Sequence, residues 1–426
     1  MRQEKNNIFL GVDWVLILLF ILLVSFGWIN IYAASQTETQ GHILDFSTRY
    51  GKQLLWMLLC IPLIILILFF NAKFYERFAS IFYLFSLLLL AGLFVFGKTI
   101  NGATSWYHIG SMSLQPSEFA KAFTALAVAK LLSDRQYNLK LIKNQIKAFI
   151  VVFFPAVLIL FQPDAGSALV YVAFFFVLNR EGLTLNYILL GLSTITLFIF
   201  TIYFGTTFVL ILLLSLITII SIYKIYKGGN HFLRFNWLKV LGVYLTVGLF
   251  IFFSDFTYTN VFKQHHRDRF EVLLGKKIDN QNIGYNIHQS ELTISSGGFW
   301  GKGFLQGERT QGKFVPEQDT DYIFSTVGEE WGFLGSSLVI LLFMFLIYRI
   351  IYLADTHNNK FGRIYGYGLA SILFFHVTLN IGMVIGLLPT IGIPLPFFSY
   401  GGSSLWGFTL LLFIFIRLDA HKDYDW

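Results

Sequence analysis

Apolar runs, most of them about the length of a membrane-spanning helix, alternate with short polar segments along most of the chain. About 20 apolar residues in a helix cross the hydrocarbon core of a bilayer. The pattern therefore predicts an all-α polytopic membrane protein. Twelve such segments are predicted, of which the sixth is short: 12–34, 51–70, 76–97, 116–132, 147–162, 166–179, 185–203, 206–226, 237–254, 331–353, 364–386 and 401–418.

The spacing of these segments divides the chain into three parts. Nine spans are predicted in residues 1–254 and three in residues 331–426. Between them lies a polar segment, 255–330, which is too long to be a simple connector. We expect it to form one large loop.

Lysine and arginine are enriched in cytoplasmic loops of membrane proteins. If the N-terminus is cytoplasmic, eighteen Lys and Arg residues fall on cytoplasmic segments, whereas the short outer loops hold only Arg49, Lys52 and Lys98. This bias predicts that both termini are cytoplasmic and that the large loop is extracytoplasmic. The first apolar run is long enough to span and has no small-residue cleavage site, so no cleavable signal peptide is expected.

Composition agrees with a lipid environment: 56% of the 426 residues are hydrophobic and 13% are charged, against about a quarter charged in soluble domains. The net charge of +7 does not indicate nucleic-acid binding, because the basic residues sort by side of the membrane. The single cysteine, Cys60, cannot form an internal disulfide and is expected to serve packing.

Charged residues occur where the fourth predicted span begins, in "QPSEFAKAF". Glu118 and Lys121 are three residues apart and so share one helical face. A charge inside a span is costly unless it is paired or hydrated. Two interpretations stay open: an internal ion pair that fixes helix packing, or a polar cavity in which Lys121 faces an anionic ligand.

Two further segments combine helix breakers with polar residues, "QPDAGS" with Asp164 and "GLLPTIGIPLPFFSYGGSS" (386–404) with Ser399. Irregular backbone at membrane depth is tolerated only where it is buried in protein or lines a cavity. We therefore predict cavity-lining or re-entrant segments, with Asp164 and Ser399 as candidate substrate-binding residues. Ordinary loops are the alternative.

The large loop holds three recognisable stretches. "YNIHQSELTIS" is typical of an amphipathic helix on the membrane surface, and "SSGGFWGKGFLQG" predicts a glycine-rich turn that lacks the spacing of a phosphate-binding P-loop. The third, "FVPEQDTDYIFSTVGEE", gathers five acids. Glu329 and Glu330 suit the first turn of the following span through the helix dipole.

Asp319 and Asp321 are the acids in this stretch that we consider for chemistry. Asp321 is followed by the apolar run "YIF". Partial desolvation there raises the pKa of a carboxylate and makes it a better base. The sequence shows no metal-ligand cluster, nucleophile motif or nucleotide fingerprint.

Five motifs, in this order, resemble those of the SEDS family (shape, elongation, division and sporulation): "QPSEFAK", "QPDAGS", "SSGGFWGKG", "FVPEQDTDYIFSTVGEEWGFLG" and "NIGMVIGLLPTIGIPLPFFSYGGSS". The chain is most similar to the elongation members, RodA, rather than the division members, FtsW. The resemblance implies a peptidoglycan glycosyltransferase that polymerises lipid II at the outer face of the cytoplasmic membrane, with a class B penicillin-binding protein as partner.

The resemblance also implies roles for individual residues. Asp321 stands at the position of the family's essential aspartate, Glu118 and Lys121 match functional residues of the fourth span, and Trp106 matches a sensitive tryptophan. The chain departs from the family in three places. Its twelve predicted spans exceed the family's ten, with an extra pair expected between residues 185 and 254. Thr104 and Ser105 replace residues that are often basic, and Asp319 stands where the family often has histidine.

The implied reaction joins two sugars and releases undecaprenyl pyrophosphate. The attacking 4-hydroxyl must lose a proton, so one general base is required, and a single displacement inverts the anomeric carbon. The leaving pyrophosphate needs cationic stabilisation rather than an acid. The candidates are Lys121 and the pair Arg267 and Arg269 in "HRDRF", whose alternative is a solvated or headgroup-binding face. A divalent cation, Mg²⁺ or Mn²⁺, is a further candidate.

Three alternatives compete with an elongation glycosyltransferase. A flippase for a lipid-linked precursor suits twelve spans with broken helices, but a carrier needs charged residues near the bilayer midplane, whereas the acids here gather at the predicted outer face. The other two alternatives are the division paralogue FtsW and a scaffold without activity.

Overall fold

The computed structural model describes residues 11–36, 45–100, 102–110, 112–227, 237–262, 264–274, 276 and 283–421. The chain forms two compact units, one made of Met1–Leu183 with Tyr285–Trp426 and the other of Thr184–Gly284.

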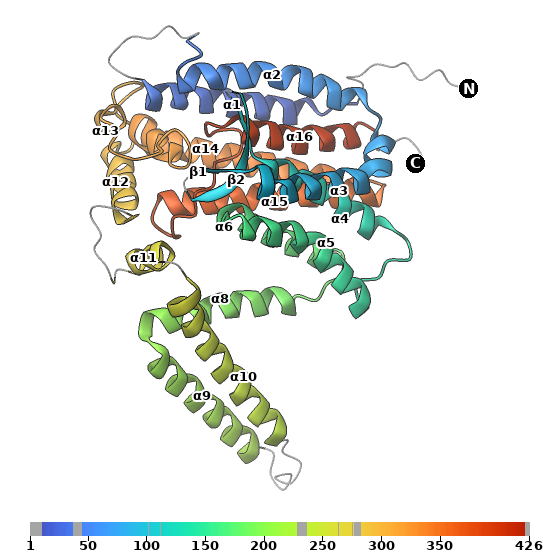
Figure 1. Ribbon diagram of the computed structural model, residues 1–426, viewed down its shortest axis with the longest axis vertical. Helices are drawn as coiled ribbons and strands as arrows, with labels where there is room; N and C mark the ends of the chain where they lie inside the picture. Colours follow the sequence, from blue (N-terminus) through green and yellow to red (C-terminus); the bar gives the residue numbers. More distant parts are fainter. Residues whose placement is uncertain are drawn as a thin grey trace. The chain divides into compact units, whose positions relative to one another are not determined.

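The first unit is a bundle of helices, in which α12 and α13 lie at one end beside the start of α14 (Figure 1). Most of its long helices match the apolar runs of the sequence. In chain order the helices are α1 (Trp14–Ser35), α2 (Arg49–Phe69), α3 (Ala72–Phe96), α4 (Pro116–Ser133), α5 (Ile142–Phe161), α6 (Ala165–Leu169), the 3₁₀ turn η1 (Val170–Ala173), α7 (Phe174–Arg180), α12 (Ile283–Ser296), α13 (Glu308–Gln311), α14 (Ile323–Asp355), α15 (Lys360–Val384) and α16 (Gly402–Asp419).

Helix α4 lies at the centre of this bundle, packed against α3, α15 and α16. Small buried residues such as Ala122 and Ala125 allow neighbouring helices to approach closely. The approach of α16 is especially close, because a Cβ on Gly407 would lie only 2.9 Å from the Glu118 carbonyl oxygen. The two charged residues of α4 are therefore enclosed by protein.

A small antiparallel sheet precedes α4 and was not part of the all-α expectation. It consists of β1 (Lys98–Ile100), β2 (Ala103–Ile109) and β3 (Met112–Leu114), with β2 in the middle. The Thr104 amide donates a 3.0 Å hydrogen bond to the Gln162 carbonyl. This bond ties the sheet to the end of α5.

The predicted breaks are present. α5 ends at Phe161 and the chain continues as the short α6, η1 and α7, which confirms the interruption at "QPDAGS". No helix occurs between α15 and α16, which confirms the irregular backbone predicted for residues 386–404. α14 begins at Ile323, earlier than the predicted 331, and it is interrupted at Gly332 (φ +62°).

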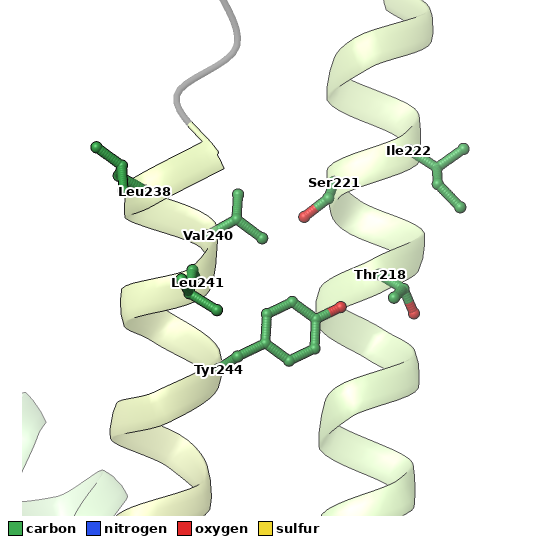
Figure 2. Close-up of a pocket in the computed structure, with 7 residues that line it drawn as sticks. All are labelled: Thr218, Ser221, Ile222, Leu238, Val240, Leu241 and Tyr244. Carbon is green, nitrogen blue, oxygen red and sulfur yellow. The ribbon is translucent and has the colours of Figure 1, made fainter.

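The second unit contains α8 (Asn186–Phe204), α9 (Thr206–Lys227), α10 (Trp237–Phe256), the π-helical turn η3 (Thr257–Val261) and α11 (Gln264–Leu273). Helices α9 and α10 lie side by side. A groove between them, shown in Figure 2, carries no charged side chain among its lining residues, so it is suited to apolar rather than anionic groups. The residues that line it are Thr218, Ser221, Ile222, Leu238, Val240, Leu241 and Tyr244.

Ten helices of the described chain are long and apolar enough to cross a membrane. The other two predicted spans correspond to α4, which carries three charged residues, and to the short pieces from Ala165 to Arg180. The protein is thus a multi-pass membrane protein with an all-α architecture, although a count of twelve spans is not confirmed. Cys60 is buried, as expected for packing.

Candidate functional site

Asp321 lies immediately before α14, and its side chain is neither fully buried nor fully exposed. One of its carboxylate oxygens, Oδ2, is 3.4 Å from the point where a Cβ on Gly392 would lie. Gly392 is exposed and has φ +75°, a conformation that favours glycine. The carboxylate therefore borders an accessible stretch of the segment between α15 and α16.

The helix break at "QPDAGS" packs against this same stretch. A Cβ on Gly166 would lie 2.9 Å from the Ile391 carbonyl oxygen, so glycine permits the contact. Residues 391–393 thus lie between the α5–α6 break and Asp321, and we call them the 391–393 wall. The structure brings together two segments that the sequence suggested separately.

The Asp164 carboxylate is engaged in local structure. It caps α6 by accepting hydrogen bonds from the Ser167 amide (3.0 Å) and hydroxyl (2.9 Å), and it accepts a third from Gln115 Nε2 (3.0 Å). The main-chain N–H of Gln115 in turn donates to the Ser403 hydroxyl at the start of α16 (3.0 Å). Asp164 therefore holds the break to the entry of α4 and, through Gln115, to α16.

Glu118 and Lys121 form a buried ion pair. The Lys121 ammonium lies 2.9 Å from both Glu118 oxygens and 2.9 Å from His376 Nε2. An ammonium has three donors, and all three have acceptors here. Lys121 is only 2% exposed. This geometry agrees with the ion-pair interpretation.

Asp319 is also paired. Its carboxylate accepts hydrogen bonds from Arg49 at the start of α2 and from the Ser35 hydroxyl at the end of α1 (3.4 Å), and its carbonyl accepts from the Tyr400 amide (2.9 Å). The Asp319 side chain is 6% exposed. Of the two aspartates considered for chemistry, Asp319 thus joins three segments, whereas Asp321 borders accessible backbone.

Glu329 organises the loop that leads to Asp321. It is fully buried and accepts hydrogen bonds from the amides of Arg309 (3.1 Å) and Thr310 (2.7 Å), the hydroxyls of Thr310 (2.8 Å) and Ser296 (3.2 Å), and the Lys302 ammonium (3.0 Å). The expectation that it occupies the first turn of the span is wrong, because α14 begins six residues earlier and its first turn holds no acid.

The glycine-rich stretch fills the break in α14 with backbone hydrogen bonds. The amides of Lys302 and Gly303 donate to the carbonyls of Glu329 and Glu330, each at 3.0 Å. In return the Phe333 amide donates to the Gly298 carbonyl (3.0 Å). Peptide groups freed by the interruption at Gly332 are thereby satisfied, as buried backbone requires.

The remaining predicted residues lie in different settings. Trp106 is half-buried on β2, opposite Lys98 in the ladder. Ser399 is buried, and its hydroxyl accepts a hydrogen bond from the Leu395 amide (2.8 Å), so it shapes the local turn. Arg267 and Arg269 lie on α11 of the second unit. Their relation to Asp321 stays a prediction.

Sequence comparison provides the decisive observation on family. The cell cycle protein family of FtsW, RodA and SpoVE matches residues 13–223 and 193–424, which is most of the chain. The protein belongs to this family, the SEDS family.

Individual SEDS relatives agree with the assignment. The chain is 30% identical to the peptidoglycan glycosyltransferase RodA of Treponema pallidum (strain Nichols), over 96% of this chain and 98% of the relative. It is 32% identical to the peptidoglycan glycosyltransferase MrdB of Escherichia coli (strain K12), over 78% and 75%. Both relatives are named as peptidoglycan glycosyltransferases.

Solved SEDS structures share the fold. A chain from a study of the structural coordination of polymerization and crosslinking by a peptidoglycan synthase complex matches with a TM-score of 0.70 and 25% identity, over 97% of this chain and 99% of that chain. RodA of Thermus thermophilus matches with a TM-score of 0.61 and 24% identity, over 97% and 98%.

Sequence reasoning missed three buried polar residues of this SEDS chain: His376 and Asn380 on α15, and Gln318. The first two were detectable, because polar side chains inside an apolar span are rare and mark interactions. Gln318 donates 3.0 Å hydrogen bonds to the hydroxyls of Thr310 and Thr326, a role that only the folded loop reveals. Within the described residues, no group of three or more His, Cys, Asp or Glu side chains is placed to hold a metal ion, and the divalent cation stays a prediction.

Proposed function

We propose that the protein is a peptidoglycan glycosyltransferase that polymerises lipid II into glycan strands at the outer face of the cytoplasmic membrane and serves cell elongation and shape. Its relatives RodA and MrdB are named as peptidoglycan glycosyltransferases, which supports this proposal. The site assignment rests on the partly exposed Asp321 carboxylate beside the exposed Gly392.

Asp321 acts as the general base. A carboxylate oxygen of Asp321 accepts the proton of the acceptor sugar's 4-hydroxyl, and the hydroxyl oxygen forms the new bond to the anomeric carbon of the donor. The bond between this carbon and the pyrophosphate oxygen breaks, and its electron pair leaves with undecaprenyl pyrophosphate. Because the displacement is single, the anomeric configuration inverts.

Charge on the leaving pyrophosphate requires cations. Lys121 already has three acceptors and is buried, so we assign it to the architecture of α4 rather than to direct contact with the anion. Arg267 and Arg269 on α11 remain the candidates among the side chains. A divalent cation, when bound, would supply further electrostatic stabilisation of the developing negative charge.

A class B penicillin-binding protein is the proposed partner, since polymerised strands must be crosslinked. The matching chain from a peptidoglycan synthase complex supports a partnership of this kind. The bias of Lys and Arg supports cytoplasmic termini and an outer location for Asp321.

The test uses purified full-length protein with its transpeptidase partner and fluorescent lipid II, with glycan chains resolved on gels. Asp321→Asn is expected to abolish polymerisation while the protein remains folded and bound to its partner. Asp319→Asn is the matched control. It lies two residues away and removes the ion pair with Arg49, so it should lower stability and retain polymerisation per folded molecule. Normal glycan from Asp321→Asn would remove Asp321 as the base.

A further inference from the structure

Asn380 is a fully buried amide in the apolar helix α15. A polar group at such a position is costly unless it is hydrogen-bonded. Both donors of its Nδ2 group are used, one on the Asp321 carbonyl at 2.8 Å and one on the Ile393 carbonyl at 2.7 Å. One side chain therefore joins two segments that are far apart in the sequence.

The two acceptors, the carbonyls of Asp321 and Ile393, flank the contact between the Asp321 carboxylate and Gly392 that defines the candidate site. Ile393 is the residue after Gly392, whose Cβ position lies 3.4 Å from the Asp321 carboxylate. By holding the Asp321 and Ile393 carbonyls, the amide fixes how far the carboxylate stands from the 391–393 wall. The wall has no helix or strand of its own, so its position depends on side-chain contacts of this kind.

The helix that carries Asn380 is itself anchored one turn earlier. His376 lies four residues before Asn380, so both side chains project from the same face of α15. His376 accepts the 2.9 Å contact from Lys121 on α4. α15 is thus tied to α4 at one position and to the Asp321 turn at the next.

We propose that Asn380 is a positioning residue for the general base: its amide sets the placement of Asp321 against the 391–393 wall. This inference rests on the proposed function, in which Asp321 accepts the proton of the attacking hydroxyl. Both Nδ2 donors of Asn380 are used by main-chain carbonyls, so its removal should affect turnover more than substrate binding.

The experiment compares Asn380→Ala with Asn30→Ala in the full-length protein with its transpeptidase partner. Asn30 is a matched control, because it is also fully buried in a span but donates only to the Phe26 carbonyl of its own helix (2.8 Å). Thermal unfolding in detergent gives the loss of stability in each variant. Polymerisation of lipid II gives kcat and KM per folded molecule between pH 5 and 9.

We expect Asn380→Ala to lower kcat at least tenfold with KM within about twofold, and to move the acidic limb of the pH–rate profile, whereas Asn30→Ala keeps kcat and the profile of the wild type. Asn380→Ser retains one donor and should fall between wild type and Asn380→Ala. If the alanine variant does not fold, the serine variant carries the same comparison.

Two results would overturn the inference. The first is that the wild type is active and Asp321→Asn is inactive, but Asn380→Ala matches Asn30→Ala in kcat and pH profile. In that case the Asn380 amide is merely structural, and the proposed function stands. If the wild type forms no glycan from lipid II, the proposed function fails and the positioning role fails with it.

Discussion

The Lys121 ammonium on α4 and the His376 imidazole on α15 are 2.9 Å apart, and the ammonium is equally close to both Glu118 oxygens. Since an ammonium can only donate, His376 Nε2 must accept, which places the proton of the neutral ring on Nδ1. The Phe408 ring covers the group, with its centroid 4.9 Å from Lys121 Nζ. The pair is therefore an enclosed link between two central helices.

Lys121→Met should destabilise the protein strongly. Removing one partner leaves the Glu118 charge buried and uncompensated, at a cost of about 3–5 kcal/mol. The double variant Glu118→Gln/Lys121→Met should recover part of this loss, because no buried charge remains. Denaturant unfolding in mild detergent measures both. A single variant as stable as the wild type would contradict the assignment of this pair to helix packing.

The sequence predicted most of the helices because lipid-facing spans need apolar residues along their whole length. It located the breaks at "QPDAGS" and at 386–404 for an equally direct reason, since proline and glycine stop helices. The small sheet before α4 was missed. Its strands are short, and the chain reverses at Gly102 (φ +84°) and Gly110 (φ +65°).

The candidate site was predictable in part. Asp321 was a candidate because of its apolar neighbours. The sequence could not show that the Asp319 carboxylate forms an ion pair with Arg49, which lies 270 residues away in the chain. Glu329 shows the same difficulty. The helix dipole predicted that Glu329 lies in the first turn of a span. Its five hydrogen-bond donors instead come from a loop that lies next to Glu329 only in the folded protein.

Glu329→Gln should loosen the loop that precedes Asp321. The substitution keeps the shape but replaces charge-assisted hydrogen bonds, each worth about 1.5–3 kcal/mol, by weaker neutral ones. Hydrogen exchange of the Arg309 and Thr310 amides should accelerate at least about tenfold, equivalent to about 1.4 kcal/mol. Glu308→Gln is the control, because that side chain is 88% exposed and should change exchange little. Unchanged protection in Glu329→Gln would refute the anchoring role.

Gly301→Ala should be far more harmful than Gly298→Ala. Both glycines have positive φ (+80° and +59°), which costs an alanine about 1–2 kcal/mol. A Cβ on Gly301 would also lie 2.2 Å from the Glu330 carbonyl oxygen, whereas nothing lies within 4 Å of one on Gly298. The added overpacking costs about 1–3 kcal/mol more, which brings the expected loss for Gly301→Ala to about 2–5 kcal/mol. Thermal unfolding of both variants measures the difference, and equal losses would argue against the inserted-loop geometry.

The ion pair of Lys302 predicts a dependence of stability on alkaline pH. The hydrogen bond from its ammonium to Glu329 raises the pKa of Lys302 above its ordinary value. A group whose pKa is raised on folding stabilises fully below its unfolded pKa, about 10.4 for lysine, and this stabilisation disappears as the pH rises through the folded pKa. The stability difference between wild type and Lys302→Met should thus be constant from pH 7 to 9 and shrink above about pH 10.4. Thermal unfolding in detergent across this range measures it, and a difference that persists unchanged at pH values well above the lysine pKa would show that the ammonium contributes nothing through its charge.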